Sequence, residues 1–227
     1  MSLSIIVPML NEAAGITDAL RALRDLDAEI VAVDGGSSDK TVECATPHAN
    51  LLLSAARGRA RQMNAGAAAA QGDILLFLHA DTRLPPAAAD QIIKQSIASG
   101  ALWGRFDVEI SGKSAWFPVI AAMMNWRSRL TGIATGDQAI FVKRSAFEQI
   151  GGFPDLPLME DIVLSQRLKK LTRPACLRQK VVTAGRRWEK HGILRTILTM
   201  WWLRLRFFFG ADPKQLAIEY GYAPNAQ

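Results

Sequence analysis

Short apolar runs alternate with helical segments over the first third of the chain, and this alternation restricts the fold more than any other feature. The runs, rich in aliphatic and β-branched residues, cover residues 3–8, 29–33, 51–53 and 74–78. Ile16, Leu20 and Leu23 have helical spacing after the first run, a second helix is expected to begin near Lys40, and an alanine-rich helix is expected over 57–70. Strands that alternate with helices predict a parallel sheet covered on both faces.

The remainder of the chain is less regular. Residues 102–110 and 136–142 are predicted strands, and residues 161–170 are a predicted helix. Residues 116–126 are apolar over too short a distance to span a bilayer, which favours a core or interfacial segment. With 227 residues and no repeat or convincing linker, the chain is expected to form a single α/β domain.

Composition places the chain among ordinary globular proteins. Apolar residues make up 49% of it and charged residues 21%, which excludes a disordered chain. Cys44 and Cys176 lie far apart without metal-type spacing, and the amino terminus lacks a basic stretch followed by an apolar signal core. We therefore expect a reduced, cytoplasmic protein.

Positive charge is concentrated near the carboxyl end. The formal net charge is +6, and residues 178–206 contain eight basic residues against one acid, Glu189. Nucleic acid, anionic lipid or a substrate with a pyrophosphate group would each complement this charge, and a solvated basic surface needs no partner at all. Charge alone does not choose among these alternatives.

Polar residues follow three of the predicted strands at the point where each strand ends. Asn11 and Glu12 follow the first strand, Asp34 and Gly35 the second, and His79 and Asp81 the fourth; these six residues are candidates for binding a ligand. Ligands of open parallel sheets collect beyond the carboxyl ends of the strands, so these residues are expected to line one rim.

Each candidate also has a simpler structural explanation. Asp81 offers hard oxygen ligands for Mg²⁺ or Mn²⁺, but an aspartate there would also cap the next helix. Arg57 and Arg61, near a helix start, suit a diphosphate or a solvated helix face. The turn at 35–41 lacks the glycine-to-Gly-Lys spacing of a nucleoside-triphosphatase loop, and no G-x-G-x-x-G occurs.

The order of these motifs resembles that of family-2 glycosyltransferases, which have the GT-A fold. The matching blocks are Ile-Ile-Val-Pro-Met-Leu-Asn-Glu at 5–12, Val-Asp-Gly-Gly-Ser-Ser-Asp-Lys-Thr at 33–41, Phe-Leu-His-Ala-Asp at 77–81, Gly136-Asp137, Gly-Gly-Phe at 151–153, Glu160-Asp161 and Arg-Arg-Trp at 186–188. The resemblance ends near residue 190, and the short length is similar to that of a compact bacterial subgroup. It implies a Rossmann-like, mostly parallel sheet in one domain.

The resemblance also implies roles for individual residues. Pro8, Glu12 and Asp34 would hold the nucleoside, Asp81 would hold a divalent metal (Mn²⁺ or Mg²⁺) and the diphosphate, and Asp161 would be the general base of an inverting transfer. The other residues expected on the donor side are Asn11, Gly35, Arg57, Arg61, His79, Arg186 and Arg187. Those expected on the acceptor side are Gly136, Asp137, Glu160 and Trp188.

Two departures from the family pattern bear on the metal and the diphosphate. His79 stands where the family's acidic motif begins with a carboxylate, and the later Gln-x-x-Arg-Trp pattern is incomplete. Arg186 and Arg187 are candidates to contact phosphate in compensation, or belong to the basic surface.

The three parts of the expected domain are residues 1–110, which bind the nucleotide sugar, residues 111–190, which bind the acceptor and carry catalysis, and residues 191–227, a helix and tail. Within the last part, 193–209 predicts an amphipathic helix with tryptophan and phenylalanine beside arginines. It suits peripheral contact with the inner face of the membrane, packing on the domain or a homodimer contact. Arg204 projects into its apolar face and needs to snorkel or meet a phosphate.

The sequence thus predicts transfer of a sugar from a nucleotide-diphosphate donor to an acceptor hydroxyl, with a lipid-linked or a small polar acceptor as alternatives. A non-catalytic adaptor that binds nucleotide sugar or a membrane surface is the main competing hypothesis. Nucleotidyl transfer is disfavoured because the first loop lacks glycine and arginine. Nucleic-acid binding is disfavoured because the aromatic residues follow a helical pattern.

Overall fold

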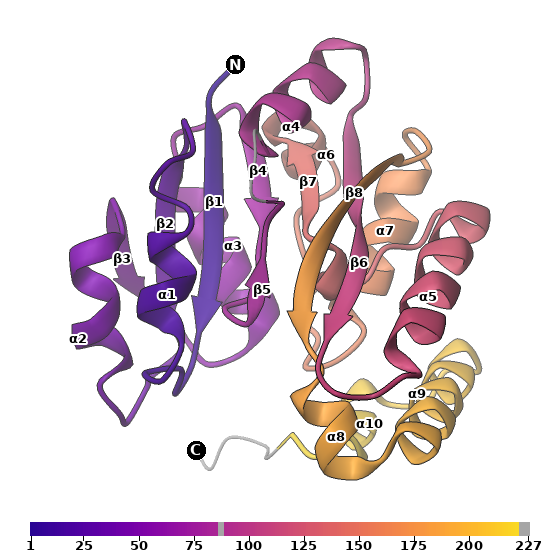
Figure 1. Cartoon of the computed structure of the whole chain (residues 1–227). Coiled ribbons are helices and arrows are strands. Elements are labelled where there is room, and N and C mark those ends of the chain that lie inside the picture. The colour runs from indigo at the N-terminus through magenta and orange to yellow at the C-terminus, as the bar shows by residue number, and fades with distance from the viewer. Residues whose placement is uncertain (86–88, 223–227) are drawn as a thin grey trace.

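The computed structural model describes residues 1–85 and 89–222, which form one eight-stranded sheet with helices on both faces (Figure 1). The strand order is β3-β2-β1-β4-β7-β6-β8-β5. The strands are β1 (Leu3–Met9), β2 (Glu29–Asp34), β3 (Leu51–Ser54), β4 (Ile74–Phe77), β5 (Thr82–Arg83), β6 (Trp103–Ser111), β7 (Ile140–Lys143) and β8 (Ala175–Ala184). The α-helices are α1 (Ile16–Arg21), α2 (Thr41–Ala45), α3 (Arg59–Ala69), α4 (Ala89–Ala98), α5 (Phe117–Thr131), α6 (Arg144–Gln149), α7 (Glu160–Lys169), α8 (Arg186–His191), α9 (Ile193–Phe208) and α10 (Pro213–Glu219). Two 3₁₀ turns complete the described chain, η1 (Thr46–His48) and η2 (Gly136–Gln138).

The first four strands are parallel, as their alternation with helices predicts. Strand β1 lies between β2 and β4, yet it contains Pro8, which has no backbone N–H to donate. Pairing with β4 ends at Ile6, opposite Phe77, whereas pairing with β2 continues to Met9. Pro8 therefore occupies the part of β1 that extends beyond β4, where the missing N–H breaks no rung between those strands.

The second half of the sheet corrects the sequence prediction in two places. Residues 136–142 are not one strand, because η2 precedes β7 and Ala139 between them has a left-handed φ of 48°. Strand β8 was not predicted. It runs parallel to β6 and antiparallel to β5, while β7 is antiparallel to both β4 and β6. The sheet is therefore mixed beyond β4.

Alternating strand residues send side chains into two cores, one on each face of the sheet. Helices α1, α4 and α5 cover one face, where Ile5, Phe106 and Phe141 are fully buried. Helices α3, α6 and α7 cover the other, around Ile6 and Phe77. The predicted apolar segment 116–126 falls largely within α5.

The carboxyl ends of β1, β6 and β8 point to the lower edge of the sheet in Figure 1, where α8 and α10 also lie. The predicted helix over 193–209 is confirmed as α9, which buries Thr196 and Leu203. Its other side leaves large apolar side chains exposed, namely Leu194, Leu198, Trp201, Trp202, Leu205 and Phe208. Among the described residues, no helix combines the length and apolar character needed to cross a membrane.

Candidate functional site

The loops that follow β1 and β2 are joined by hydrogen bonds at the strand ends. The Asn11 amide donates to Oγ of Ser37 at 3.0 Å, and Oδ1 of Asn11 accepts from the Ser38 amide at 2.9 Å. The Glu12 amide donates to Oγ1 of Thr41 at 2.7 Å. Asn11 has a left-handed φ of 54°, which asparagine tolerates better than most residues. Asn11 and Glu12 thus meet the glycine turn, as the strand-end rule predicts.

Asp34, at the end of β2, shapes the glycine turn from inside. Its side chain is buried, and its carboxylate accepts hydrogen bonds from the Gly36 amide at 2.9 Å and from the amide and hydroxyl of Ser37. Charged acceptors of amide hydrogens hold such turns firmly. Asp34 therefore fixes the loop on which any nucleoside contact would depend.

Gly35 is required at its position by a close side-chain contact. A Cβ atom there would lie 2.9 Å from the side chain of Gln62. Nε2 of Gln62 donates to the carbonyls of Met9 and Val33, each at 2.9 Å, and the Gly35 amide donates to the Met9 carbonyl. Gln62, on α3, thereby ties the ends of β1 and β2 together.

Asp81 and Glu12 lie on either side of one cation. Nη2 of Arg186 is 3.6 Å from Oε2 of Glu12 and 3.8 Å from Oδ2 of Asp81. Arg186 reaches them because β5, directly after Asp81, pairs with β8, directly before α8. Partial burial raises the pKa of Glu12, Arg186 opposes this change, and Asp81 adds to it.

The residues around Asp81 offer a partial fit to a divalent metal. Asp81 and Glu12 present hard carboxylate oxygens, which suit Mg²⁺ or Mn²⁺. Their shared contact with the Arg186 guanidinium marks this point as one where positive charge is favourable. Within residues 1–85 and 89–222, however, no group of three or more His, Cys, Asp or Glu side chains is arranged to hold a metal ion. A bound metal would need further ligands from the diphosphate.

His79 connects the end of β4 to η2. Its Nδ1 lies 3.6 Å from Oδ1 of Asp137, and a Cβ atom on Gly136 would approach the imidazole ring to 2.4 Å. Glycine at 136 therefore makes room for His79. The pKa of Asp137 lies below its usual value: burial acts to raise it, but His79 and the cations of Arg59 and Arg204 outweigh burial.

Asp161 lies in the first turn of α7, against the same turn. Its Oδ2 accepts a hydrogen bond from the Gly136 amide at 2.9 Å and its Oδ1 accepts one from the Ile162 amide at 2.7 Å. A small pocket is lined by Asp161, Glu160, Gly136 and His79 together with apolar side chains. The predicted base therefore shares one pocket with His79 and with two of the predicted acceptor-side residues, Gly136 and Glu160, whereas Asp137 and Trp188 are not in its lining.

Glu160 faces a different neighbour. It is buried, and its Oε1 lies 3.8 Å from Nη1 of Arg59. The other terminal nitrogen of Arg59, Nη2, donates to the hydroxyl of Tyr222. Burial raises the pKa of Glu160, Asp161 adds to this effect, and Arg59 opposes it. Met159, just before these two acids, has a left-handed φ of 68°, a strained conformation for this residue type.

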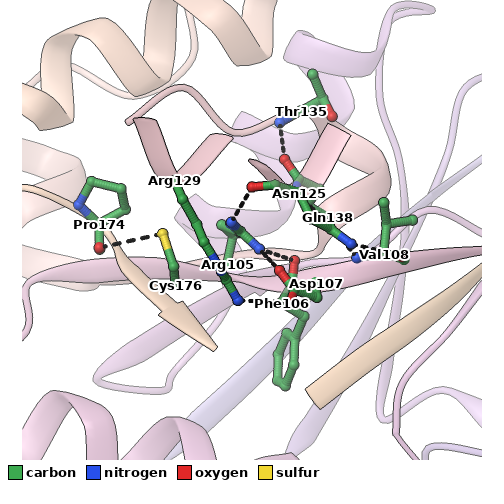
Figure 2. A network of polar contacts seen from close by, with 10 residues as sticks. All are labelled: Arg105, Phe106, Asp107, Val108, Asn125, Arg129, Thr135, Gln138, Pro174 and Cys176. Carbon is green, nitrogen blue, oxygen red and sulfur yellow. Dashed lines mark hydrogen bonds and ion pairs between the residues drawn. The ribbon is translucent and has the colours of Figure 1, made fainter. Parts of the chain in front are cut away.

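A polar network that was not predicted from the sequence connects η2 to α5 and β6 (Figure 2). Oδ1 of Asn125, on α5, accepts from the Val108 amide at 2.8 Å and from Nε2 of Gln138 at 3.3 Å. Gln138 and Thr135 form a capping box around η2. Because Gly136 lies within this turn, the network fixes the amide that contacts Asp161.

The same network contains a buried charge cluster (Figure 2). Arg105 on β6 is fully buried and pairs with Asp107, whose Oδ2 also accepts from Arg129 at 2.7 Å. Arg105 donates in addition to the Asn125 carbonyl at 3.1 Å. The only sequence signal for this cluster is charge inside a predicted strand, at Arg105 and Asp107.

The remaining predicted residues lie in varied settings. Arg57 is exposed before α3, and Arg61 donates two hydrogen bonds to Asp155, at 2.8 and 3.0 Å. Trp188 packs against the core on the α5 face, rather than standing free. Arg187 belongs to α8, but its side chain lies outside the described part of the chain.

The sequence model of glycosyl transferase family 2 matches residues 4–151. The chain belongs to glycosyl transferase family 2. A curated relative, the probable glycosyltransferase YdaM of Bacillus subtilis (strain 168), is 25% identical over 195 residues, covering 74% of this chain and 46% of the relative. The chain thus spans about half the length of that relative.

Solved structures share the fold. The S. aureus TarS fragment 1–349 in complex with UDP-GlcNAc has a TM-score of 0.67 and 18% identity, covering 81% of this chain and 58% of that one. Glucosyl-3-phosphoglycerate synthase from Mycobacterium tuberculosis, in complex with Mn²⁺, UDP and glucosyl-3-phosphoglycerate, has a TM-score of 0.58 and 20% identity, covering 80% and 70%. These likenesses confirm the GT-A fold.

Proposed function

We propose that the protein transfers a glycosyl unit from a nucleotide-diphosphate sugar to an acceptor hydroxyl, with inversion at the anomeric carbon. The observation that carries this proposal is Asp161, whose carboxylate contacts the Gly136 amide in a pocket shared with His79. This pocket adjoins the strand-end rim that contains Asp34, Glu12 and Asp81. A carboxylate that can take a proton from the acceptor hydroxyl is the group that single-displacement glycosyl transfer needs.

In the proposed reaction Asp161 accepts the proton of the acceptor hydroxyl. The acceptor oxygen then forms a bond to the anomeric carbon, while the bond from that carbon to the diphosphate oxygen breaks and the nucleoside diphosphate leaves. Attack from the face opposite the leaving group inverts the centre. The Gly136 amide orients Asp161, and the Asn125–Gln138 contact holds the turn that carries this amide.

On the donor side, the loops fixed by Asp34 and Gln62 would receive the nucleoside. Asp81, with Glu12 beside it, would hold Mn²⁺ or Mg²⁺ in company with the diphosphate, and the metal would supply positive charge against the departing diphosphate. Arg186 already lies between these carboxylates and is available to contact the diphosphate. UDP is the nucleotide named with both TarS and the mycobacterial synthase, so uridine donors are the first candidates.

The proposal also covers the acceptor and the location in the cell at which the protein acts. The exposed apolar side of α9 fits either peripheral contact with a membrane, which would favour a lipid-linked acceptor, or a homodimer contact. Trp201 and Trp202 are both exposed there, and Arg195 and Arg206 lie on the same helix. Aromatic side chains near arginines are typical of interfacial helices.

The test is thermal denaturation of the protein with UDP-, GDP-, dTDP- and CDP-sugars, each with and without Mn²⁺, for the wild type and Asp81→Ala. A ligand that binds the native state raises the melting temperature. We expect a metal-dependent rise with one nucleotide class, absent in Asp81→Ala. The matched control is Asp25→Ala, which removes an exposed carboxylate that follows α1 and lies outside the predicted site.

If no donor raises the melting temperature, the proposed transferase site is wrong. If a donor raises the melting temperature but no turnover is found with any of several acceptors, the result would favour the adaptor hypothesis. His79, in place of the family's carboxylate, is the feature compatible with such an adaptor, whereas the presence of Asp81 and Asp161 argues against it.

A further inference from the structure

Two arginines each have one buried guanidinium nitrogen that finds no hydrogen-bond acceptor among the described residues. They are Nη2 of Arg127 on α5 and Nε of Arg204 on α9. Neither residue forms an ion pair within the described chain. Buried polar atoms are almost always satisfied, and a buried donor atom left without an acceptor is costly. The pair therefore calls for an anion that the chain itself does not supply.

Arg127 lies within electrostatic range of Asp161, and Arg204 lies within range of Asp137. Leu203, the neighbour of Arg204, packs in one cluster with Met159, which directly precedes Glu160 and Asp161. Helices α5 and α9 adjoin at the lower right of Figure 1. The nearest carboxylates are directed elsewhere, because Asp161 accepts from backbone amides and Asp137 faces His79.

The electrostatic effects agree with this placement. Burial lowers the pKa of Arg127 to about 10, the Arg204 cation adds to this effect, and Asp161 opposes it. Arg204 also helps to lower the pKa of Asp137. The two cations therefore repel each other while both lie within electrostatic range of the acidic side of the pocket.

We propose that Arg127 and Arg204 bind a phosphate group carried by the acceptor, and so select phosphate-bearing acceptors for the reaction at Asp161. This inference rests on the proposed function. Guanidinium groups match phosphate oxygens in geometry and charge, and one phosphate between two arginines would relieve their repulsion. Phosphate is favoured over a carboxylate because it offers enough oxygens for two guanidinium groups at once.

The surroundings of Arg204 accommodate a phosphate on a soluble molecule or on a lipid. Arg204 adjoins the exposed apolar side of α9, which includes Leu198, Trp201, Leu205 and Phe208. A lipid chain would lie against this apolar side with its phosphate at the arginines, whereas a soluble phosphomonoester would leave it uncovered. The shared chemistry is the phosphate.

The experiment measures melting temperature against inorganic phosphate at constant ionic strength, with and without saturating UDP and Mn²⁺. The proteins are the wild type, Arg127→Gln, Arg204→Gln and the control Arg195→Gln, which changes an exposed arginine on α9. We expect phosphate to stabilise the wild type and the control even when UDP is bound. In each of the other two variants the apparent affinity for phosphate should fall about tenfold or more.

Ligand-free Arg127→Gln and Arg204→Gln should melt no lower than the wild type, because each removes an unpaired buried donor, so loss of folding will not mimic loss of binding. A phosphate response unchanged in both variants would overturn the inference. Loss of the UDP response together with the phosphate response would also overturn it, because the pair would then serve the donor diphosphate. Absence of any UDP response in the wild type would instead count against the proposed function.

Co-sedimentation with phosphatidylcholine vesicles, with and without phosphatidic acid, separates the two sources of phosphate. Binding that requires phosphatidic acid and is lost in Arg127→Gln and Arg204→Gln would support a lipid phosphate. A response to inorganic phosphate with no such vesicle binding would support a soluble phosphomonoester.

Discussion

The two sides of the candidate site are built in different ways. On the donor side, hydrogen bonds among the strand-end loops and from Gln62 on α3 fix the rim, and its acidic residues are balanced by Arg186. On the base side, Asp161 depends on η2, which α5, β6 and β7 support, and two arginines nearby remain unpaired. On the donor side the acidic residues thus already have a cation beside them, whereas the base side has positive charge without a partner.

The prediction with the largest expected effect concerns the base side and the substitution Gly136→Ala. The new methyl group would displace the His79 ring, which lies 2.4 Å from its position, and would shift the amide that orients Asp161. We expect turnover, measured as release of nucleoside diphosphate from the donor, to fall about 100-fold, because small misplacements of catalytic groups have effects of this size. Donor affinity should fall much less than turnover, because the loops that Asp34 and Gln62 hold stay in place and His79 is the donor-side residue that is displaced.

Gly15→Ala is the matched control, since a Cβ atom at Gly15 meets nothing within 4 Å. Equal loss of turnover in both variants, or a loss of donor affinity in Gly136→Ala as large as its loss of turnover, would contradict the separate construction of the two sides.

A second prediction concerns stability. Asn125→Ala removes the side chain that accepts from the Val108 amide and from Gln138, and leaves these donors unsatisfied. We expect the free energy of unfolding in urea to fall by about 2–3 kcal/mol, the cost of unsatisfied buried groups. Met123→Ala, on the exposed side of the same helix, should change it by less than about 0.5 kcal/mol. Similar values for the two variants would show that the network does not stabilise the base side.

The smallest expected effect is a pH dependence from Glu160. Its pKa in the folded protein is raised above the ordinary value of 4.5, first by burial. Protonation therefore favours the folded state, and this contribution is present below pH 4.5 and lost as pH rises through the folded pKa. The melting temperature of Glu160→Gln minus that of the wild type should therefore increase from pH 4.5 toward neutrality. A difference that does not change with pH would exclude this role for Glu160.

The same contrast explains what the sequence could predict. Asn11, Glu12, Asp34, His79 and Asp81 follow strands that local hydrophobic patterns reveal, so their common rim was predictable from strand order. Strand β8 was not, because it lies between β6 and the short β5 near the edge of the sheet and three successive residues, Arg178, Gln179 and Lys180, are exposed. Its charges therefore resemble those of a solvated surface.

The support for Asp161 was hidden for a different reason. Asn125 and Gln138 are 13 positions apart, and Asn125 meets Val108 only through the packing of α5 on β6. No spacing rule connects residues of a helix, a strand and a 3₁₀ turn. The same holds for Arg127 and Arg204, although the polar position of Arg204 in an apolar helix face was an early sign that it needs a partner.

The most direct test of the account compares Asp161→Asn with the wild type for donor binding and for turnover in the same preparation. Asparagine keeps an acceptor for the Gly136 amide but cannot accept a proton at neutral pH, and Asp155→Asn is the control for loss of an acid near α7. We predict unchanged donor affinity with turnover reduced about 10²–10⁴-fold, the usual contribution of a general base. Full turnover in Asp161→Asn, or loss of donor binding along with turnover, would contradict the assignment of Asp161 as the base.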